Sequence, residues 1–287
     1  MKFDFGEVLR RARQIAWRYK SFWLIGIVIS LVSFVFASIN LAHNPAFSSL
    51  AVPSAVNTQL RPILSNMFLI LLTVLSILLF VMGISIPSLG TVQLEQGNEK
   101  VSFGHLIRSV LPYFWRILVI VLLVWMGMFL AISILITFFV SISFLTLGLG
   151  LLCAFPLLLL LILGVILVYA LMEEGVSAVL VDNLGVSNAL RRAWELINKN
   201  PREMILMSLM SYVVAIAAIM IISIVMIIPI GGAVPNVQSF QTLSPNIILW
   251  TLAFLFFYAI IQGMLLTFLQ SAWTLIYLRL TRLTTPS

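Results

Sequence analysis

Three glutamates are the residues of this chain with the clearest capacity for chemistry, because each follows a long apolar stretch. Glu95 follows the second such stretch, and Glu173 and Glu174 follow the fourth. Carboxylates in these positions could bind a cation or a lipid head group. Charges at helix ends generally reach toward water and pair, so we favour an interpretation in which Glu174 pairs with Arg191 or Arg192.

Two glutamines are the main polar groups of the last apolar stretch. Gln262 lies near its middle and Gln270 lies closer to its end. An amide within a membrane generally forms a hydrogen bond between helices worth about 1 kcal/mol, and we expect that role here. Ionisable residues, which mark proton relays and ion pathways, are missing from the middle of every apolar stretch. The sequence therefore argues against a proton-coupled pump and leaves a hydrophobic or lipidic substrate open.

The sequence contains no recognisable set of residues for catalysis or metal binding. A nucleotide-binding loop, a zinc-protease motif and a Ser/His/Asp set are all missing. Cys153 is the single cysteine, and His43 and His105 are far apart along the chain, so neither a disulfide framework nor a metal site is expected. We predict no catalytic residues, no metal and no cofactor.

The composition excludes a water-soluble enzyme. Of 287 residues, 62% are hydrophobic and 9% are charged, whereas soluble domains are about 45–50% apolar and about 25% charged. A helix needs roughly 20 apolar residues to cross a bilayer. Six stretches meet that requirement: 22–42, 67–92, 114–145, 151–172, 204–228 and 247–278. Pairs of small residues four apart, Gly26/Ser30 and Ala259/Gly263, predict close helix contacts.

The basic residues predict the orientation of these stretches. Fifteen of the 16 lysines and arginines lie on the side that carries both termini, and only Arg61 lies on the other. The positive-inside rule then places both termini in the cytoplasm. We expect a multi-pass protein of the cytoplasmic membrane, whose net charge of +7 orients the chain and does not bind nucleic acid.

A short basic segment recurs before each odd-numbered apolar stretch. Residues 5–12, 103–110 and 186–193 align without gaps as FGEVLRRA, FGHLIRSV and VSNALRRA. Apolar residues at helical spacing share one face of each copy, and arginines lie on the opposite face. We expect each copy to be a helix in the membrane interface, with its apolar face down and its arginines among anionic head groups.

The predicted fold is an all-α membrane protein with six transmembrane helices in three hairpins, each preceded by a basic amphipathic interfacial helix. The single domain, 1–287, divides into units 1–92, 93–172 and 173–287. Interfacial helices commonly anchor a bundle, and we favour that role. The alternative is a cytoplasmic collar that recruits a partner or senses lipid. Its candidate residues are Arg10, Arg11, Arg108, Arg191, Arg192 and Trp194.

The FGEVLRRA opening, the ALRRAW run of the third copy and the linker QLEQGNEKVSFG at 93–104 point to one known group. The chain resembles, over essentially its whole length, six-span bacterial and archaeal proteins of the glycerophosphoryl diester phosphodiesterase membrane-domain group. In some members of that group the membrane region is fused to a soluble phosphodiesterase barrel that carries the chemistry. This sequence ends a few residues beyond its last apolar stretch, so we expect the barrel to be missing and the enzymatic activity not to transfer.

Two functional hypotheses follow. The first is a non-catalytic accessory or scaffold protein that assembles with other membrane proteins, or with copies of itself, through its basic cytoplasmic face. The second is a transporter or lipid-handling protein whose hairpins enclose a hydrophobic cavity. Pro87 and Pro156 fit the second hypothesis, because prolines kink helices. Lipids of the anionic inner leaflet are expected partners in both cases.

Overall fold

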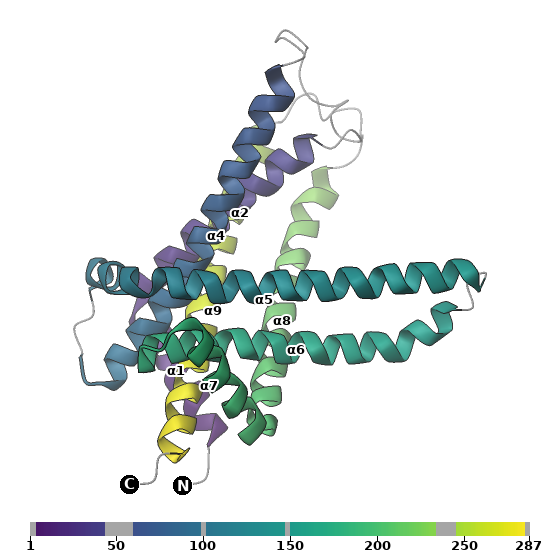
Figure 1. The fold of residues 1–287 in the computed structure, drawn as a ribbon. Helices are drawn as coiled ribbons and strands as arrows, with labels where there is room; N and C mark the ends of the chain where they lie inside the picture. The colour runs from purple at the N-terminus through teal and green to yellow at the C-terminus, as the bar shows by residue number, and fades with distance from the viewer. Residues whose placement is uncertain (1–3, 44–59, 99–101, 147–149, 234–244, 285–287) are drawn as a thin grey trace.

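The described residues of the computed structural model, 4–43, 60–98, 102–146, 150–233 and 245–284, form helices and no strands. The elements are α1 (Phe5–Arg18), η1 (Lys20–Phe22), α2 (Trp23–His43), α4 (Leu60–Glu95), α5 (Phe103–Leu145), α6 (Gly150–Asp182), α7 (Val186–Lys199), α8 (Pro201–Ala233) and α9 (Pro245–Thr284) (Figure 1). Five helices are long and apolar enough to cross a membrane, and the bent pair of α1 and α2 would make a sixth. The side chains of His43, Arg61, Cys153 and Pro156 lie outside the described part.

A sharp bend separates α1 from α2. The Asp4 carboxylate caps the start of α1 by accepting hydrogen bonds from the backbone N–H groups of Gly6 and Glu7. Between α1 and the first part of α2 the chain turns by 81°. The indole N–H of Trp23 donates to the carbonyl of Ala16 at 2.8 Å, in the last turn of α1, where carbonyls lack helical partners. A side chain of α2 therefore holds the bend.

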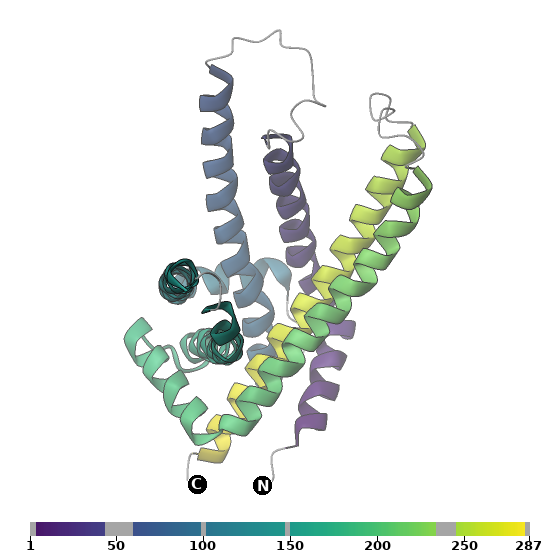
Figure 2. The same cartoon turned by 90° about the vertical axis from the view of Figure 1, so that its right-hand side faces the viewer.

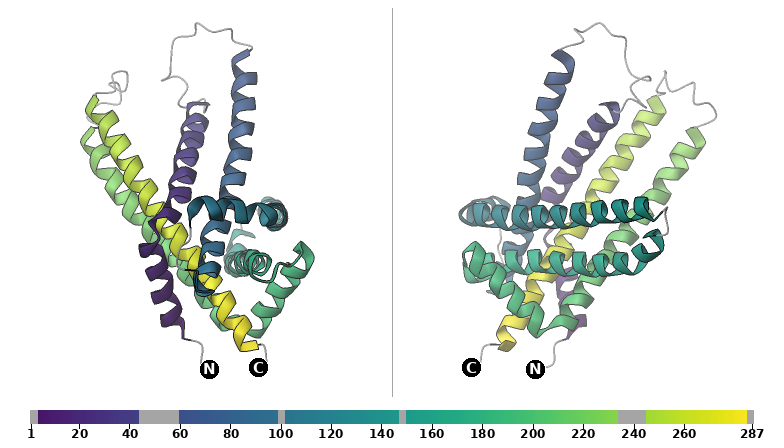
Figure 3. Two further views of the ribbon diagram at one scale, coloured as in Figure 1. Left: turned by 90° about the vertical axis from the view of Figure 1, so that its left-hand side faces the viewer. Right: turned by 45° about the vertical axis from the view of Figure 1, so that its right-hand side comes forward.

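The second basic segment differs from the prediction of a separate interfacial helix. Residues 103–110 are the first turns of α5, which continues without a break for 43 residues. These turns run across the left view of Figure 3, whereas the rest of α5 is seen nearly end-on. Pro112 lies inside the helix at this point, and proline bends a helix because it lacks an N–H and crowds the preceding turn.

The long helices do not all run in one direction. α5 packs along α6, and α9 contacts α2, α4 and α8. Figure 1 shows α5 and α6 crossing the direction of α4, α8 and α9, and Figure 2 shows the two crossing helices nearly end-on. The layout of three membrane-crossing hairpins and the cytoplasmic location of both termini therefore stay predictions.

Burial concentrates in one region, which we call the inner core. It comprises α1, α7 and residues 81–94 of α4, 106–124 of α5, 169–181 of α6 and 267–280 of α9. The start of α1 and the end of α9 lie at this end of the molecule (Figure 1). Residues 66–75 of α4 and 125–145 of α5, which we call the outer halves, are mostly exposed apolar side chains. Such surfaces are suited to lipid or to other membrane proteins.

Close helix packing confirms the prediction from the small-residue pairs. A Cβ atom added to Gly26 of α2 would lie 2.4 Å from the Cα of Gly263 in α9. A Cβ atom added to Gly263 would lie 2.5 Å from the carbonyl oxygen of Trp23. Real Cβ atoms do not approach other atoms this closely, so glycine at both positions lets the two backbones touch.

The apolar faces of α1 and α7 are covered by protein, which corrects the expectation that they rest on lipid. α1 packs on α9 and buries Val8, Ala12 and Ile15, and α7 packs on α6 and buries its own apolar face. The buried residues of α7 are Ala189, Ala193, Leu196 and Ile197. Small alanines on these faces let the neighbouring helix approach closely enough to exclude lipid. The opposite, basic faces are what α1 and α7 present outward.

Candidate functional site

Two of the three candidate glutamates lie inside the inner core and not at a helix end. α6 continues to Asp182 as a single helix of 33 residues, about 50 Å long at 1.5 Å per residue. Glu173 and Glu174 lie within it at 2% and 0% exposure. The helix is longer than the roughly 30 Å of bilayer hydrocarbon, so apolar length alone misplaced its end.

A network of buried polar side chains surrounds Glu173. Nε2 of Gln270 in α9 donates to Oε1 of Glu173 at 3.1 Å, and the hydroxyl of Ser88 in α4 donates to Oε1 of Gln270 at 3.3 Å. The hydroxyl of Thr91 donates to that of Ser271 at 3.0 Å, one turn along the same contact. Gln270 therefore forms the expected hydrogen bonds between helices, and the network joins α4, α6 and α9.

Glu174 is buried without a partner, which contradicts the expected pairing with an arginine. Neither of its carboxylate oxygens has a hydrogen-bond partner among the described residues. Arg191 and Arg192 instead approach Glu195, at 3.3 Å and 3.9 Å. Glu195 lies one turn along the same exposed helix, so this pairing does not bury a guanidinium group. A carboxylate in this position needs a proton or a cation to compensate its charge.

The other candidate polar residues take separate places. Glu95 lies at the end of α4, where Nε of Arg11 in α1 reaches its Oε1 at 2.9 Å, so it is not part of the Glu173 and Glu174 cluster. Nε2 of Gln262 donates to the hydroxyl of Tyr258 at 3.0 Å, within α9. Among the described residues, Gln262 therefore forms no hydrogen bond between helices, because a partner lies one turn away on the same helix.

The basic residues of the three repeated segments occupy matched positions without forming one cluster. Arg10, Arg108 and Arg191 align with one another, and all three are exposed on three different helices. On α7, Trp194 is 53% exposed, and Arg191 three residues before it has an 81% exposed side chain. Residues three apart share one side of a helix, so these two side chains form a common surface.

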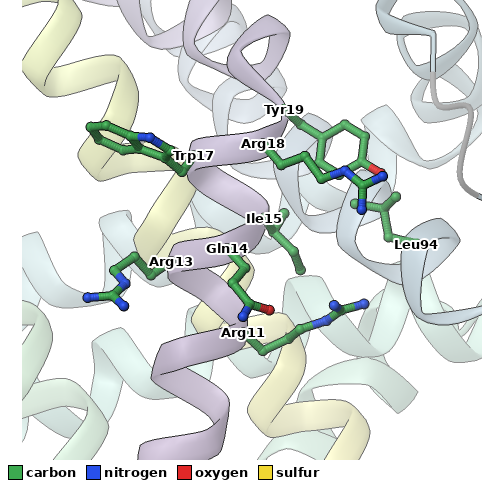
Figure 4. A pocket seen from close by; sticks show the side chains of 8 residues that line it. All are labelled: Arg11, Arg13, Gln14, Ile15, Trp17, Arg18, Tyr19 and Leu94. Carbon is green, nitrogen blue, oxygen red and sulfur yellow. The ribbon is translucent and has the colours of Figure 1, made fainter.

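A groove between α1 and the end of α4 contains residues that sequence reasoning missed. Its volume is about 640 Å³, and Figure 4 shows its lining. Arg11, Gln14 and Arg18 form a stripe along α1, because they follow one another at helical spacing. The spacing of these three residues was visible in the sequence. The other wall of the groove is formed by Leu94, which lies 76 positions after Arg18 along the chain.

A metal centre finds no support in the part of the chain that the structure describes. Within it, no group of three or more His, Cys, Asp or Glu side chains is placed to hold an ion. Comparison with family models, with curated proteins and with solved structures gives no match for this chain.

Proposed function

We propose that this chain is a non-catalytic accessory or scaffold protein of the cytoplasmic membrane that docks other membrane proteins through the basic face of α7. One observation carries the proposal: α7 has a covered apolar face and an uncovered face with an arginine and a tryptophan. α6 covers Ala189 and Ala193, while Arg191 and Trp194 are exposed. Tryptophan and arginine are enriched at the energetic centres of protein interfaces.

A protein partner accounts for this face better than lipid alone does. A helix that rests on a bilayer inserts its apolar side, and that side of α7 is already in contact with α6. The strongly uneven distribution of basic residues along the sequence supports a cytoplasmic location for α7 and both termini. The same proposal includes the resemblance to the phosphodiesterase membrane-domain group: the chain would correspond to the membrane region of that group, which has no chemistry of its own.

Photo-crosslinking tests the docking face. A photoreactive amino acid replaces Trp194, which is 53% exposed, in one variant and, as the control, Trp115 of α5, which is 69% exposed, in another. Irradiation of native membranes is expected to give one discrete complex from position 194 that survives mild detergent and is lost when Arg191→Gln is added. Lipid adducts and monomers alone, or the same products from both positions, would contradict the proposal.

A second candidate function, ion-coupled transport, is favoured by the buried carboxylates. Glu173 and Glu174 lie in a helix segment, Leu161–Asp182, that is long and apolar enough to span a membrane. Ionisable residues inside such segments mark ion and proton pathways. This revises the argument from the sequence against a proton-coupled protein, which depended on placing both residues outside the apolar stretch.

Proteoliposomes distinguish the second candidate from the first. With a pH-sensitive dye inside and an imposed membrane potential, wild-type protein is expected to carry protons and Glu174→Gln to lose that flux. Glu195→Gln is the matched control, since it removes one carboxylate from the surface of α7. Equal flux from wild type and Glu174→Gln would eliminate this candidate. The lipid-handling alternative requires a cavity between several spans, and the groove on α1 does not provide one.

A further inference from the structure

The groove between α1 and α4 joins positive charge to an apolar surface. Its stripe of Arg11, Gln14 and Arg18 runs along α1, with Tyr19 and Leu94 on the side that faces α4 (Figure 4). Arg13 and Trp17 extend from the other side of α1 in the same view. Three guanidinium groups and two aromatic rings thus border one open cavity of about 640 Å³.

The charges of the groove are only partly compensated by protein. Arg11 is paired with Glu95 at 2.9 Å, which fixes the position of one guanidinium group. Among the described residues, Arg13 and Arg18 have no acidic partner, and Arg18 lies over the ring of Tyr19 at 5.8 Å. A planar guanidinium group binds phosphate oxygens with two parallel hydrogen bonds. The free ligand that best complements this surface is therefore a phosphate group.

The apolar side of the groove indicates that the phosphate belongs to a lipid. Trp17 is 62% exposed, and its ring lies 6.0 Å from that of Trp23 at the bend into α2. Immediately beyond the bend, α2 exposes Leu24, Val28 and Leu31. Tryptophan is favoured at the level of lipid head groups, and exposed leucine and valine are suited to acyl chains. A ligand that satisfies both sides carries a phosphate and hydrocarbon tails.

We propose that the groove of Arg11, Arg13, Arg18 and Trp17 is a specific binding site for an anionic phospholipid. The phosphate lies against the arginines, the tails follow the exposed side of α2, and Trp17 marks the boundary between them. The 81° bend places the two parts of the site next to each other. The site is separate from the α7 face, so a result that contradicts the docking proposal does not contradict this one.

Lipid retention by the purified protein tests the site. Arg13→Gln/Arg18→Gln is compared with the matched control Lys199→Gln/Arg202→Gln, which removes the same charge from exposed positions of α7 and α8. The probe is phosphatidylglycerol titrated into delipidated protein and counted by native mass spectrometry, with phosphatidylcholine as the neutral comparison. Each basic residue near an anionic lipid contributes about fivefold to binding. The Arg13/Arg18 variant is therefore expected to bind phosphatidylglycerol about thirtyfold more weakly, and the control to bind it like wild type.

Further measurements separate lipid from other sources of phosphate. A short-chain phosphatidylglycerol is expected to compete for the site, whereas inorganic phosphate and glycerol phosphate at the same concentration are not. Phosphatidylglycerol with brominated tails is expected to quench wild-type fluorescence more than that of Trp17→Phe. Equal loss of binding in the two double variants would overturn the proposal. Competition by inorganic phosphate, or binding of an acidic peptide in place of the lipid, would overturn it as well.

Discussion

The inner core and the outer helix halves are built from similar apolar residues but differ in how much they bury. Within α5 alone, Leu106, Ile117 and Ile120 are completely buried, whereas Phe129 and Phe144 are among the most exposed side chains of the chain. The buried and the exposed residues of this helix are equally apolar in type, so apolarity does not decide where helices pack. It determines only that the surface avoids water.

Within α4, small and hydroxyl-bearing residues distinguish the packed part from the outer half. The inner part of α4 contains Gly83, Ser85, Ser88, Gly90 and Thr91, and all of them are buried. Lipid tails are as apolar as leucine, so helices in a membrane gain little by hiding leucine from them. Close approach and hydrogen bonds between helices provide the stabilisation instead.

Shortening one leucine in each region gives the largest expected contrast. Leu106→Ala leaves a cavity in the inner core and should lower the free energy of unfolding by about 2–5 kcal/mol. Leu130→Ala, in the outer half of α5, should change it by less than about 0.5 kcal/mol. Titration with a denaturing detergent, followed by circular dichroism, measures both variants. Equal losses would show that the outer half is packed as tightly as the core.

Adding one methyl group to a glycine should have opposite effects at the close contact of α9 with α2 and in the outer half of α5. Gly263→Ala forces a Cβ atom against the carbonyl oxygen of Trp23 and should cost about 1–3 kcal/mol of stability. Gly127 of α5 has open space around the same position, so Gly127→Ala should add about 0.5–1 kcal/mol through helix propensity. The same titration measures both, and a loss of stability in Gly127→Ala would contradict the open arrangement.

Replacing each of the two buried glutamates should change the free energy of unfolding in opposite directions. Glu174→Met removes two oxygens that have no partner and should raise the free energy of unfolding by about 1–3 kcal/mol. Glu173→Met should lower it, because Nε2 of Gln270 then loses its acceptor. Thermal unfolding in mild detergent measures the two variants side by side. A loss of stability in Glu174→Met would mean that its carboxylate is bound to something that stabilises the fold.

The smallest expected effect belongs to the ion pair that holds α1 to α4. A double-mutant cycle with Arg11→Gln and Glu95→Gln should give a coupling of about 0.2–1 kcal/mol, because Arg11 is half exposed. The coupling should fall as salt is raised from low concentration to about 1 M, since surface charges are screened. A coupling unaffected by salt would place this pair inside the inner core and not at its edge.

The sequence predicted the secondary structure and membrane class of the protein better than it predicted how the helices pack. Charge-free apolar stretches are long and regular, so the all-helical membrane class followed from length and hydropathy. Small-residue spacing predicted that Gly26 and Gly263 lie at close helix contacts, and the structure shows that they contact each other. The end of α6 was not predicted, because the helix leaves its apolar stretch and continues through the buried Glu173 and Glu174 within the inner core.

The candidate sites were predicted one helix at a time and missed wherever two helices meet. The exposed Arg191 and Trp194 lie on one helix, and their shared face follows from local spacing. Glu173 meets Gln270 across a separation of 97 residues, and the groove joins α1 to Leu94. No periodicity in a single sequence indicates which helices will be neighbours, so those residues required the structure.

The contact between the N-terminal helices and α9 determines when, during synthesis, the first helices can complete their packing. α1 and α2 both pack on α9, which follows every other described helix along the chain. Arg279 near the end of α9 also donates to Glu7 of α1 at 2.9 Å. During synthesis the first helices therefore wait, with their glycine face uncovered, until α9 has been made. Chains whose synthesis stops before α9 lack this contact and are open to chaperones and proteases.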